Sequence, residues 1–316
     1  MNITVILCTY NRCQTVTKSL DSIAAQNVPA SVEWDVLVVD NNSTDQTREV
    51  LEKYCIQNPR FSYVFESKQG LSHARNAGIQ KARGEILAFT DDDVTADSDW
   101  LWSLTSSLSS GEWSFAGGRI IPVWSGKLPD WISENDLATM GPFTGFDEGL
   151  ESKALTRPSY GGNTAFRREL FEKYGGFRTD LGRSNNNLQG REDIEIANRL
   201  FAAGERLRYE PNAVIRHPVE EYRMTKRYVL RWFYWDSRSE IADKGPHSTR
   251  WNIKGVPLSF FRTLVRWAIH WAISTNARRR FFCQLQIWKL MGWAVGCYQE
   301  SGRRRRHIDT SRVSTE

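Results

Sequence analysis

Apolar runs and helical patterns alternate along the first ninety residues of the chain. Four continuous, β-rich apolar runs indicate strands that are buried on both faces: Ile3–Cys8, Trp34–Asp40, Phe61–Glu66 and Glu85–Thr90. Between them, apolar residues recur at helical spacing in three segments: Arg12–Gln26, Val50–Tyr54 and Leu71–Ala82. Buried strands that alternate with helices predict a parallel sheet with right-handed connections.

The middle of the chain has a less regular pattern. Trp113–Val123 is predicted to be a strand, and Gly161–Phe177 a strand followed by a short helix and a turn. An apolar face within Ile194–Phe201 predicts a helix that stops at Gly204. Arg206–Val219 then indicates two short strand segments that end at His217.

The end of the chain, residues 223–316, has a composition of its own. It contains 19 Lys/Arg against six Asp/Glu, whereas residues 1–222 contain 23 against 31, and seven of the 13 tryptophans follow Arg223. Arg262, Arg266 and His270 recur every four residues beside an apolar face, and a second helical pattern runs over Phe281–Val295. Basic, Trp-rich amphipathic helices suit the interface of a bilayer.

Two interpretations of this tail stay open. In the first, the helices bind an anionic membrane surface, and the basic run Gly302–His307 adds contacts to headgroups. In the second, the helices pack on the rest of the chain and their cations form a solvated face. Nucleic acid is disfavoured as a partner because no recognised binding fold accompanies the charge.

These patterns predict an α/β fold with a mostly parallel, Rossmann-like sheet flanked by helices over residues 1–222, in two halves, 1–98 and 99–222. Residues 223–316 would form a helical extension. A hydrophobic content of 40% is ample for a core and excludes a disordered chain. Five cysteines without a C-x-x-C pair, and an N-terminal strand in place of a leader, predict a cytoplasmic protein with reduced thiols.

Three polar clusters follow the predicted strands: Thr9–Arg12, Asp40–Asp45 and Thr90–Val94. Because the carboxyl ends of parallel strands meet at one edge of the sheet, we expect these clusters to form one rim, where such sheets bind ligands. In the last cluster, Asp91 and Asp93 are alternate residues of an extended segment and can share a hard divalent cation. The alternative is that the aspartates cap the next helix or lie in water.

Six segments, taken in order, resemble family 2 glycosyltransferases of the GT-A fold over roughly residues 3–218. They are "VILCTYNR", "VVDNNSTDQT", "GLSHARNAGI", "FTDDDV", "GGNTAFRR" and "GREDIEIANRL". The resemblance implies a GT-A-type sheet and inverting transfer of a sugar from a nucleoside diphosphate. It also implies a set of residues that bind the nucleotide sugar: Thr9, Tyr10, Arg12, Asp40, Arg75, Asp91 and Asp92.

By the same resemblance, Asp93 would ligate Mg²⁺ or Mn²⁺ together with Asp91, and His217 would be a third ligand. A cation stabilises negative charge as it develops on a leaving diphosphate. Each assignment has a structural alternative: Asp40 could begin an Asx turn, Arg75 could be a solvated helix residue, and His217 could be structural.

The resemblance also implies an acceptor side. Asp193 would be the general base that removes the proton of the acceptor hydroxyl, and Glu192 would support it. Both could instead be carboxylates that favour the start of a helix. Gly161, Gly162 and Asn163 would line the acceptor side, or form a tight turn into a strand. The loop before Glu192 is long and Asn-rich, and carries Arg191 where the family more often has glycine.

We therefore expect a metal-dependent hexosyltransferase-type enzyme of cell-surface polysaccharide synthesis, peripheral on the inner face of the cell membrane. Its donor would be a UDP-sugar by default, and its acceptor a glycan or a lipid-linked glycan. One alternative is a sugar-phosphate nucleotidyltransferase, but its Gly-rich phosphate loop is missing from "TYNRCQT". Another is a non-catalytic nucleotide-sugar-binding scaffold at a membrane. Such a protein would be expected to have lost the metal-binding or the base carboxylate, whereas both Asp93 and Asp193 are present.

Overall fold

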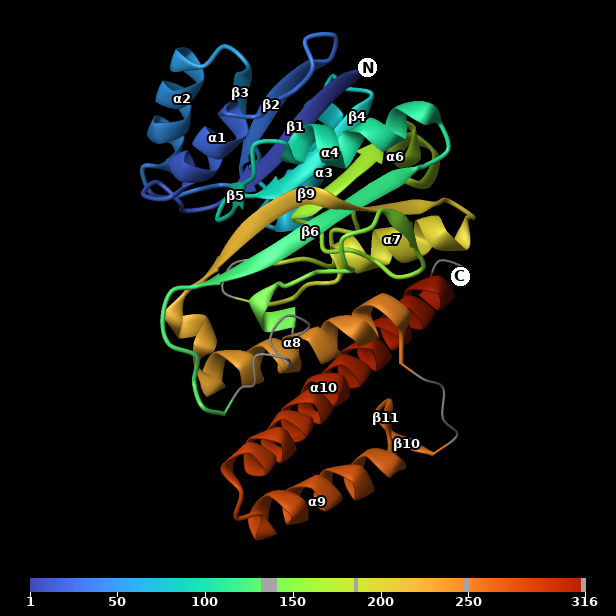
Figure 1. Ribbon diagram of the computed structural model, residues 1–316. Helices are drawn as coiled ribbons and strands as arrows, with labels where there is room; N and C mark the ends of the chain where they lie inside the picture. Colours follow the sequence, from blue (N-terminus) through green and yellow to red (C-terminus); the bar gives the residue numbers. More distant parts are fainter. Residues whose placement is uncertain (132–140, 185–186, 247–250, 314–316) are drawn as a thin grey trace. The chain divides into compact units, whose positions relative to one another are not determined.

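A mixed β-sheet organises most of the chain before residue 220. The computed structural model describes residues 1–131, 141–184, 187–246 and 251–313, with side chains as far as Gly302. Within this part of the chain the sheet has nine strands (Figure 1). Eight of them follow one another in the order β3 (Phe61–Phe65), β2 (Glu33–Asp40), β1 (Asn2–Thr9), β4 (Ile86–Asp91), β8 (Asn163–Arg167), β6 (Phe115–Trp124), β9 (Leu207–Val219) and β5 (Thr95–Ala96). The ninth, β7 (Lys153–Leu155), pairs with β9.

The first four strands of the sheet are parallel, as predicted. β1 pairs with β2 and β4, and β2 pairs with β3, all in parallel register. The connections contain α1 (Val16–Ala24), α2 (Thr47–Gln57) and α3 (Leu71–Lys81). Close packing of α3 on the sheet depends on Gly78, where an added Cβ would lie 2.6 Å from Ile6.

The later strands make the sheet mixed. β8 is antiparallel to both β4 and β6, whereas β6 and β9 are parallel. The prediction of two short segments within Arg206–Val219 was wrong, because β9 is a single strand. The register between β6 and β9 shifts between Gly118 and Arg119. The extra residues of β9 form a bulge there, and the strand continues beyond it.

Aromatic side chains fill the core between this sheet and the helices that follow it, α4 (Trp100–Thr105), α6 (Glu169–Tyr174) and α7 (Glu192–Ala202). Phe89 makes edge contacts with Phe166, Phe171 and Phe177, and Trp100 is fully buried. Full burial of each such side chain contributes roughly 1.5–3 kcal/mol. The core therefore fixes the strand ends that carry the polar clusters.

The chain divides into two compact units, and each is described separately. The first is Met1–Gly126, Glu134–Asn185 and Glu192–Glu220, and the second is Lys127–Ser133, Asn186–Arg191 and Glu221–Glu316. The helices of the second unit are α8 (Lys226–Lys244), α9 (Leu258–Ile273) and α10 (Ala277–Val313), which confirms the helical patterns of the tail. A small hairpin of β10 (Asn252–Ile253) and β11 (Val256–Pro257) precedes α9.

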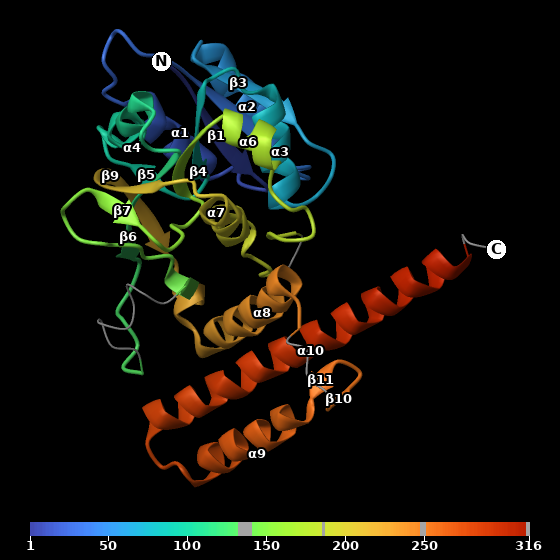
Figure 2. The same cartoon turned by 90° about the vertical axis from the view of Figure 1, so that its right-hand side faces the viewer.

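Within the second unit, α10 lies between α8 and α9 (Figure 2). Gly292 and Gly296 of α10 face α8, where added Cβ atoms would overlap the carbonyl of Tyr234 and lie 2.8 Å from the Cβ of Ile241. Of the helices described, none combines the length and the apolar character needed to cross a membrane. The basic run predicted to contact headgroups lies, from Arg303 on, outside the residues whose side chains are described.

Candidate active site

The register of the parallel strands brings the predicted polar clusters to one edge of the sheet. Thr9 at the end of β1 is paired with Asp40 at the end of β2, and Cys8 is paired with Asp91 at the end of β4. Thr9 and Asp40 are buried, whereas Tyr10 is 36% exposed. The convergence expected from parallel topology is therefore confirmed.

The loops after β1 and β2 are tied to one another. Asn11 Oδ1 accepts a hydrogen bond of 2.8 Å from the amide of Thr44, and the amide of Asn11 donates to Ser43 Oγ at 2.9 Å. Asn11 and Asn42 both have positive φ, 53° and 63°, a conformation that asparagine tolerates better than most residues. These bonds give the rim a fixed outline.

Asp40 is completely buried and makes two local hydrogen bonds. Its Oδ1 accepts from the amide of Ser43 at 2.9 Å, and its Oδ2 accepts from the hydroxyl of Tyr63 at 3.3 Å. Burial, followed by the charge of Asp40, raises the pKa of Tyr63. The Asp40 carboxylate thus closes the turn after β2 through a backbone amide three residues on. The contact of Tyr63 of β3 with Asp40 was not predicted from the sequence.

Asp92 and Asp93 lie beside one partly exposed cation, Arg12. Its Nε is 3.5 Å from Asp92 Oδ1, and its Nη2 is 3.5 Å from Asp93 Oδ2. Asp93 Oδ1 also lies 3.6 Å from Nε2 of His217, which is buried on β9. Burial, followed by the charge of Asp93, raises the pKa of Asp92 to about 7.

The donor chemistry of this group fits a hard divalent cation. Carboxylates such as those of Asp91 and Asp93 suit Mg²⁺ or Mn²⁺, and a neutral histidine nitrogen such as that of His217 is a common metal ligand. Burial and the charge of Asp93 raise the pKa of Asp91, and a nearby cation would oppose both effects. Among the described side chains, however, no three such groups are already close enough together to form a metal cluster.

Arg75 joins Asp91, of the predicted donor side, to Glu192, of the predicted acceptor side. Although it belongs to α3, its side chain is only 4% exposed, so the alternative of a solvated helix residue was wrong. Its Nη1 donates to Glu192 Oε1 at 2.8 Å, and its Nη2 is 3.7 Å from Asp91 Oδ1. The guanidinium also lies 5.3 Å from the ring centre of Phe177. Burial, followed by the charge of Asp193, raises the pKa of Glu192 to about 7, and Arg75 opposes this rise.

Gly161 and Gly162 lie between the carboxylate of Asp193 and that of Asp91. The amide of Gly161 donates to Asp193 Oδ2 at 2.8 Å, and Asp193 Oδ1 accepts from the amide of Ile194. An added Cβ at Gly161 would lie 2.9 Å from the Cβ of Asp193, and one at Gly162 would overlap the carboxylate of Asp91. The absence of side chains at these two positions lets the backbone touch both carboxylates.

Asn163 has a different position from the two glycines before it. Its side chain is completely buried, accepts from Trp100 Nε1 at 2.8 Å, and donates to the carbonyls of Arg119 and Ala213. It therefore braces β6, β9 and α4 behind the site and does not form its surface. Trp100 could not be connected with Asn163 from sequence, because the two residues are distant in the chain.

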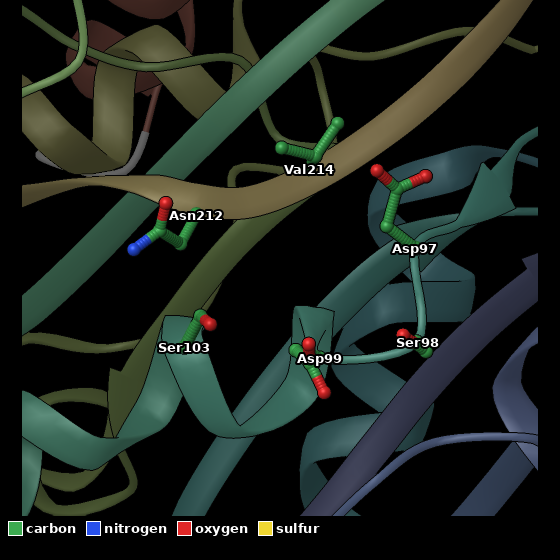
Figure 3. A pocket seen from close by; sticks show the side chains of 6 residues that line it. All are labelled: Asp97, Ser98, Asp99, Ser103, Asn212 and Val214. Atoms are coloured by element: carbon green, nitrogen blue, oxygen red, sulfur yellow. The ribbon is translucent and has the colours of Figure 1, made fainter.

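An open polar cavity of about 600 Å³ lies elsewhere on the first unit (Figure 3). Its lining side chains come from the segment after β5, from α4 and from β9: Asp97, Ser98, Asp99, Ser103, Asn212 and Val214. None of these residues was predicted to belong to the site. Asp97 is already paired with Arg216 at 2.9 Å.

The chain is similar in sequence to proteins of known name. The chain is 27% identical over 246 residues to a glucosyl-dolichyl phosphate glucuronosyltransferase of Haloferax volcanii, covering 76% of each chain. It is 27% identical over 260 residues to the succinoglycan biosynthesis protein ExoM of Rhizobium meliloti, covering 80% of each.

A solved structure shares the fold. The mannosyltransferase PcManGT of Pyrobaculum calidifontis, in complex with GDP-Man and Mn²⁺, matches with a TM-score of 0.60 and 21% identity, over 95% of this chain and 86% of that one. Residues 4–175 match the family described as Glycosyl transferase family 2. This range contains most of β1, the strands β2 to β4, Arg75, Asp91–Asp93 and Gly161–Asn163. With its GT-A-type sheet and its two groups of carboxylates brought together, the chain belongs to glycosyl transferase family 2.

Proposed function

We propose that this glycosyltransferase is an inverting, metal-dependent enzyme that moves a sugar from a nucleoside diphosphate to an acceptor hydroxyl. One observation carries the proposal: Gly161 and Gly162 touch Asp193 and Asp91, and Arg75 joins Asp91 to Glu192. These contacts support a single site in which Asp91 would serve the donor and Asp193 the acceptor, as transfer between two bound substrates requires.

On the donor side, the rim formed by Thr9, Tyr10 and Asp40 would hold the base and ribose of the nucleotide. Arg12 lies beside Asp92 and Asp93 and would neutralise charge near the diphosphate. The structure of PcManGT contains GDP-Man, whereas uridine is the default expected from the sequence. A binding test must therefore include both UDP and GDP.

The metal would be held by Asp93 and Asp91, with His217 as a third ligand. Mn²⁺ is present in the structure of PcManGT, which supports a divalent ion here. When bound, a divalent ion stabilises the negative charge of the leaving diphosphate.

On the acceptor side, Asp193 would act as general base. It would accept the proton of the acceptor hydroxyl as that oxygen bonds to the anomeric carbon and the bond to the diphosphate oxygen breaks, with its electron pair leaving on the diphosphate. The amides of Gly161 and Ile194 orient the carboxylate. Attack opposite the leaving group inverts the anomeric centre and requires no covalent sugar intermediate.

The acceptor is proposed to be a glycan or a lipid-linked glycan of a surface polysaccharide. One relative is named as acting in succinoglycan biosynthesis, and another as a glucosyl-dolichyl phosphate glucuronosyltransferase. We further propose that residues 1–222 form the catalytic domain and residues 223–316 an extension that binds an anionic membrane surface.

One face of α9 supports the membrane proposal. Phe260 is buried and stacks near Trp293 of α10, and Trp267 contacts Phe282. The opposite face, called here the α9 outer face, exposes 44–69% of five apolar residues: Leu258, Phe261, Val265, Ile269 and Ile273. Arg262 and Arg266 are exposed beside it. Apolar residues flanked by cations suit the headgroup region.

All five cysteines are free, which accords with the inner, reducing side of a cell membrane.

Replacing the proposed base tests the catalytic assignment. We expect Asp193→Asn to lower turnover at least about 100-fold while donor affinity stays within about twofold, because only the proton acceptor is removed. Glu195→Gln, on the same helix and paired with Arg199, is the matched control and should retain turnover. Turnover of Asp193→Asn above a tenth of wild type would place the base elsewhere.

Replacing Asp93 tests the metal assignment. We expect Asp93→Asn to lose the Mn²⁺-dependent part of UDP or GDP binding, measured by calorimetry with and without Mn²⁺, since a neutral amide is a poorer ligand. Asp99→Asn is the control, because Asp99 lines the cavity of Figure 3 and should leave binding intact. Unchanged Mn²⁺ dependence in Asp93→Asn would exclude the proposed ligand.

A further inference from the structure

The two residues immediately before Glu192 are fastened to α8. The amide of Gly190 donates to Ser239 Oγ at 3.3 Å. Arg191 Nη1 lies 3.5 Å from Asp236 Oδ1, and Arg191 Nε lies 3.5 Å from Asp243 Oδ2. Both residues belong to the compact unit that contains α8, whereas Glu192 opens α7 in the other unit. The chain passes from one unit to the other at the peptide bond between Arg191 and Glu192.

Arg191 occupies a backbone conformation that its side chain does not favour. Its φ is 76°, in the left-handed region where glycine is preferred. Such a conformation persists only when the surroundings over-determine it. The guanidinium is 12% exposed, and the Asp243 carboxylate is 8% exposed. The ion pair with Asp243 is therefore shielded from solvent, unlike a surface pair that contributes little, whereas Asp236 is 27% exposed.

We propose that Arg191 is a positioning residue for the general base. By holding the chain just before Glu192 on α8, the ion pairs with Asp236 and Asp243 would set the start of α7 and hence the direction of the Asp193 carboxylate. This inference rests on the proposed role of Asp193. It gives the C-terminal helices a part in catalysis that is separate from any binding to a membrane.

A purely structural ion pair would give a different result. In that case its loss would lower thermal stability and leave the turnover of the folded protein unchanged. A positioning role instead affects turnover more than donor binding, because the donor-side rim is built from β1, β2 and β4. Glycine at position 191 separates these cases, since it accepts the left-handed conformation and removes only the side chain.

The experiment compares variants of the full chain by kcat, donor KM, donor affinity and melting temperature. Arg191→Gly is expected to lower kcat at least tenfold with donor affinity within twofold, and Arg191→Lys to recover part of the loss. The double variant Asp236→Asn with Asp243→Asn should match Arg191→Gly, and combining all three changes should lower kcat no further. Lys244→Gln, on α8 and paired only with the exposed Glu240 in the described contacts, is the control and should keep wild-type kcat.

Asp193→Asn is measured alongside to separate the two ideas. If Asp193→Asn is inactive but Arg191→Gly and the double aspartate variant keep wild-type kcat, the positioning role is overturned and the base assignment stands. If Asp193→Asn remains active, the base assignment fails whatever Arg191 does. A fall in kcat of Arg191→Gly that is matched by an equal loss of donor affinity, with no recovery in Arg191→Lys, would also overturn the positioning role.

Discussion

Two ionisable residues of the site, Arg75 and Glu192, lie where solvent reaches them poorly. The side chains of Arg75 and Glu192 are 5% and 7% exposed, and they form a direct ion pair of 2.8 Å. Removing one partner of such a buried pair typically costs 3–5 kcal/mol, because the other charge stays buried. The burial of these charges, and not the residue types alone, distinguishes the site from an ordinary acidic surface.

The raised pKa of Glu192 gives a prediction about stability and pH. Because its folded pKa of about 7 lies above its ordinary value of 4.5, its contribution to the free energy of unfolding is complete below about pH 4.5 and is lost as pH rises through about 7. Glu192→Gln lacks this loss. Its free energy of unfolding should therefore rise relative to wild type by roughly 2 kcal/mol between about pH 5.5 and pH 7.

Urea unfolding at several pH values, without nucleotide or metal, measures this difference. Glu52→Gln is the control, because Glu52 lies on the exposed face of α2 and should change stability by less than about 0.5 kcal/mol at every pH. A difference between Glu192→Gln and wild type that does not vary with pH would show that burial does not raise this pKa.

At the scale of elements, the packing of α8 on α10 depends on glycine. An added Cβ at Gly292 would overlap the backbone carbonyl of Tyr234, and backbone yields less readily than a side chain. At Gly302 of the same helix there is nothing within 4 Å. The same substitution at these two positions therefore isolates the helix contact.

We expect Gly292→Ala to lower the free energy of unfolding by about 1–3 kcal/mol, the usual cost of overpacking. Gly302→Ala should be neutral or stabilising by up to about 1 kcal/mol, because alanine favours a helix. Thermal unfolding of the full chain followed by tryptophan fluorescence provides the measurement, since Trp288 and Trp293 flank Gly292. Equal melting temperatures for the two variants would contradict the close approach of the helices.

At the scale of the whole molecule, the chain is divided in charge. Residues 1–222 carry an excess of Asp/Glu, and residues 223–316 an excess of Lys/Arg. If the tail binds an anionic surface, each Lys or Arg near that surface contributes about 1 kcal/mol, and the attraction weakens with salt. The α9 outer face would add burial of apolar side chains.

We therefore expect the full chain to co-sediment with vesicles rich in phosphatidylserine at low salt, and less with neutral vesicles. Ile269→Asp, on the α9 outer face, should sharply reduce binding. Ile56→Asp is the matched control, because Ile56 is an 83% exposed isoleucine on α2 outside the tail. Equal sedimentation with neutral and anionic vesicles, or none with either, would leave the packing interpretation of the tail.

The sequence by itself determined the parallel half of the fold and the edge of the sheet where its polar clusters meet. The apolar runs predicted β1 to β4 to within one or two residues, because strands buried on both faces leave a continuous apolar signal. Their polar ends had to meet, since right-handed connections place all the carboxyl ends of parallel strands at one edge. These are local patterns combined with one topological rule.

Only the tertiary structure decided how Glu192 and Asp193 meet Arg75 and Gly161. The pairing of Arg75 with Glu192 joins residues 117 positions apart. The periodicity of apolar residues along the sequence could not predict this contact. Three other features likewise depend on contacts between distant segments. They are the burial of Asn163, the pairing of β9 with β6, and the attachment of Gly190 and Arg191 to α8. A side chain acquires its burial, its pKa and its partner from whichever segment packs on it, and that choice is made by the free energy of the whole folded chain.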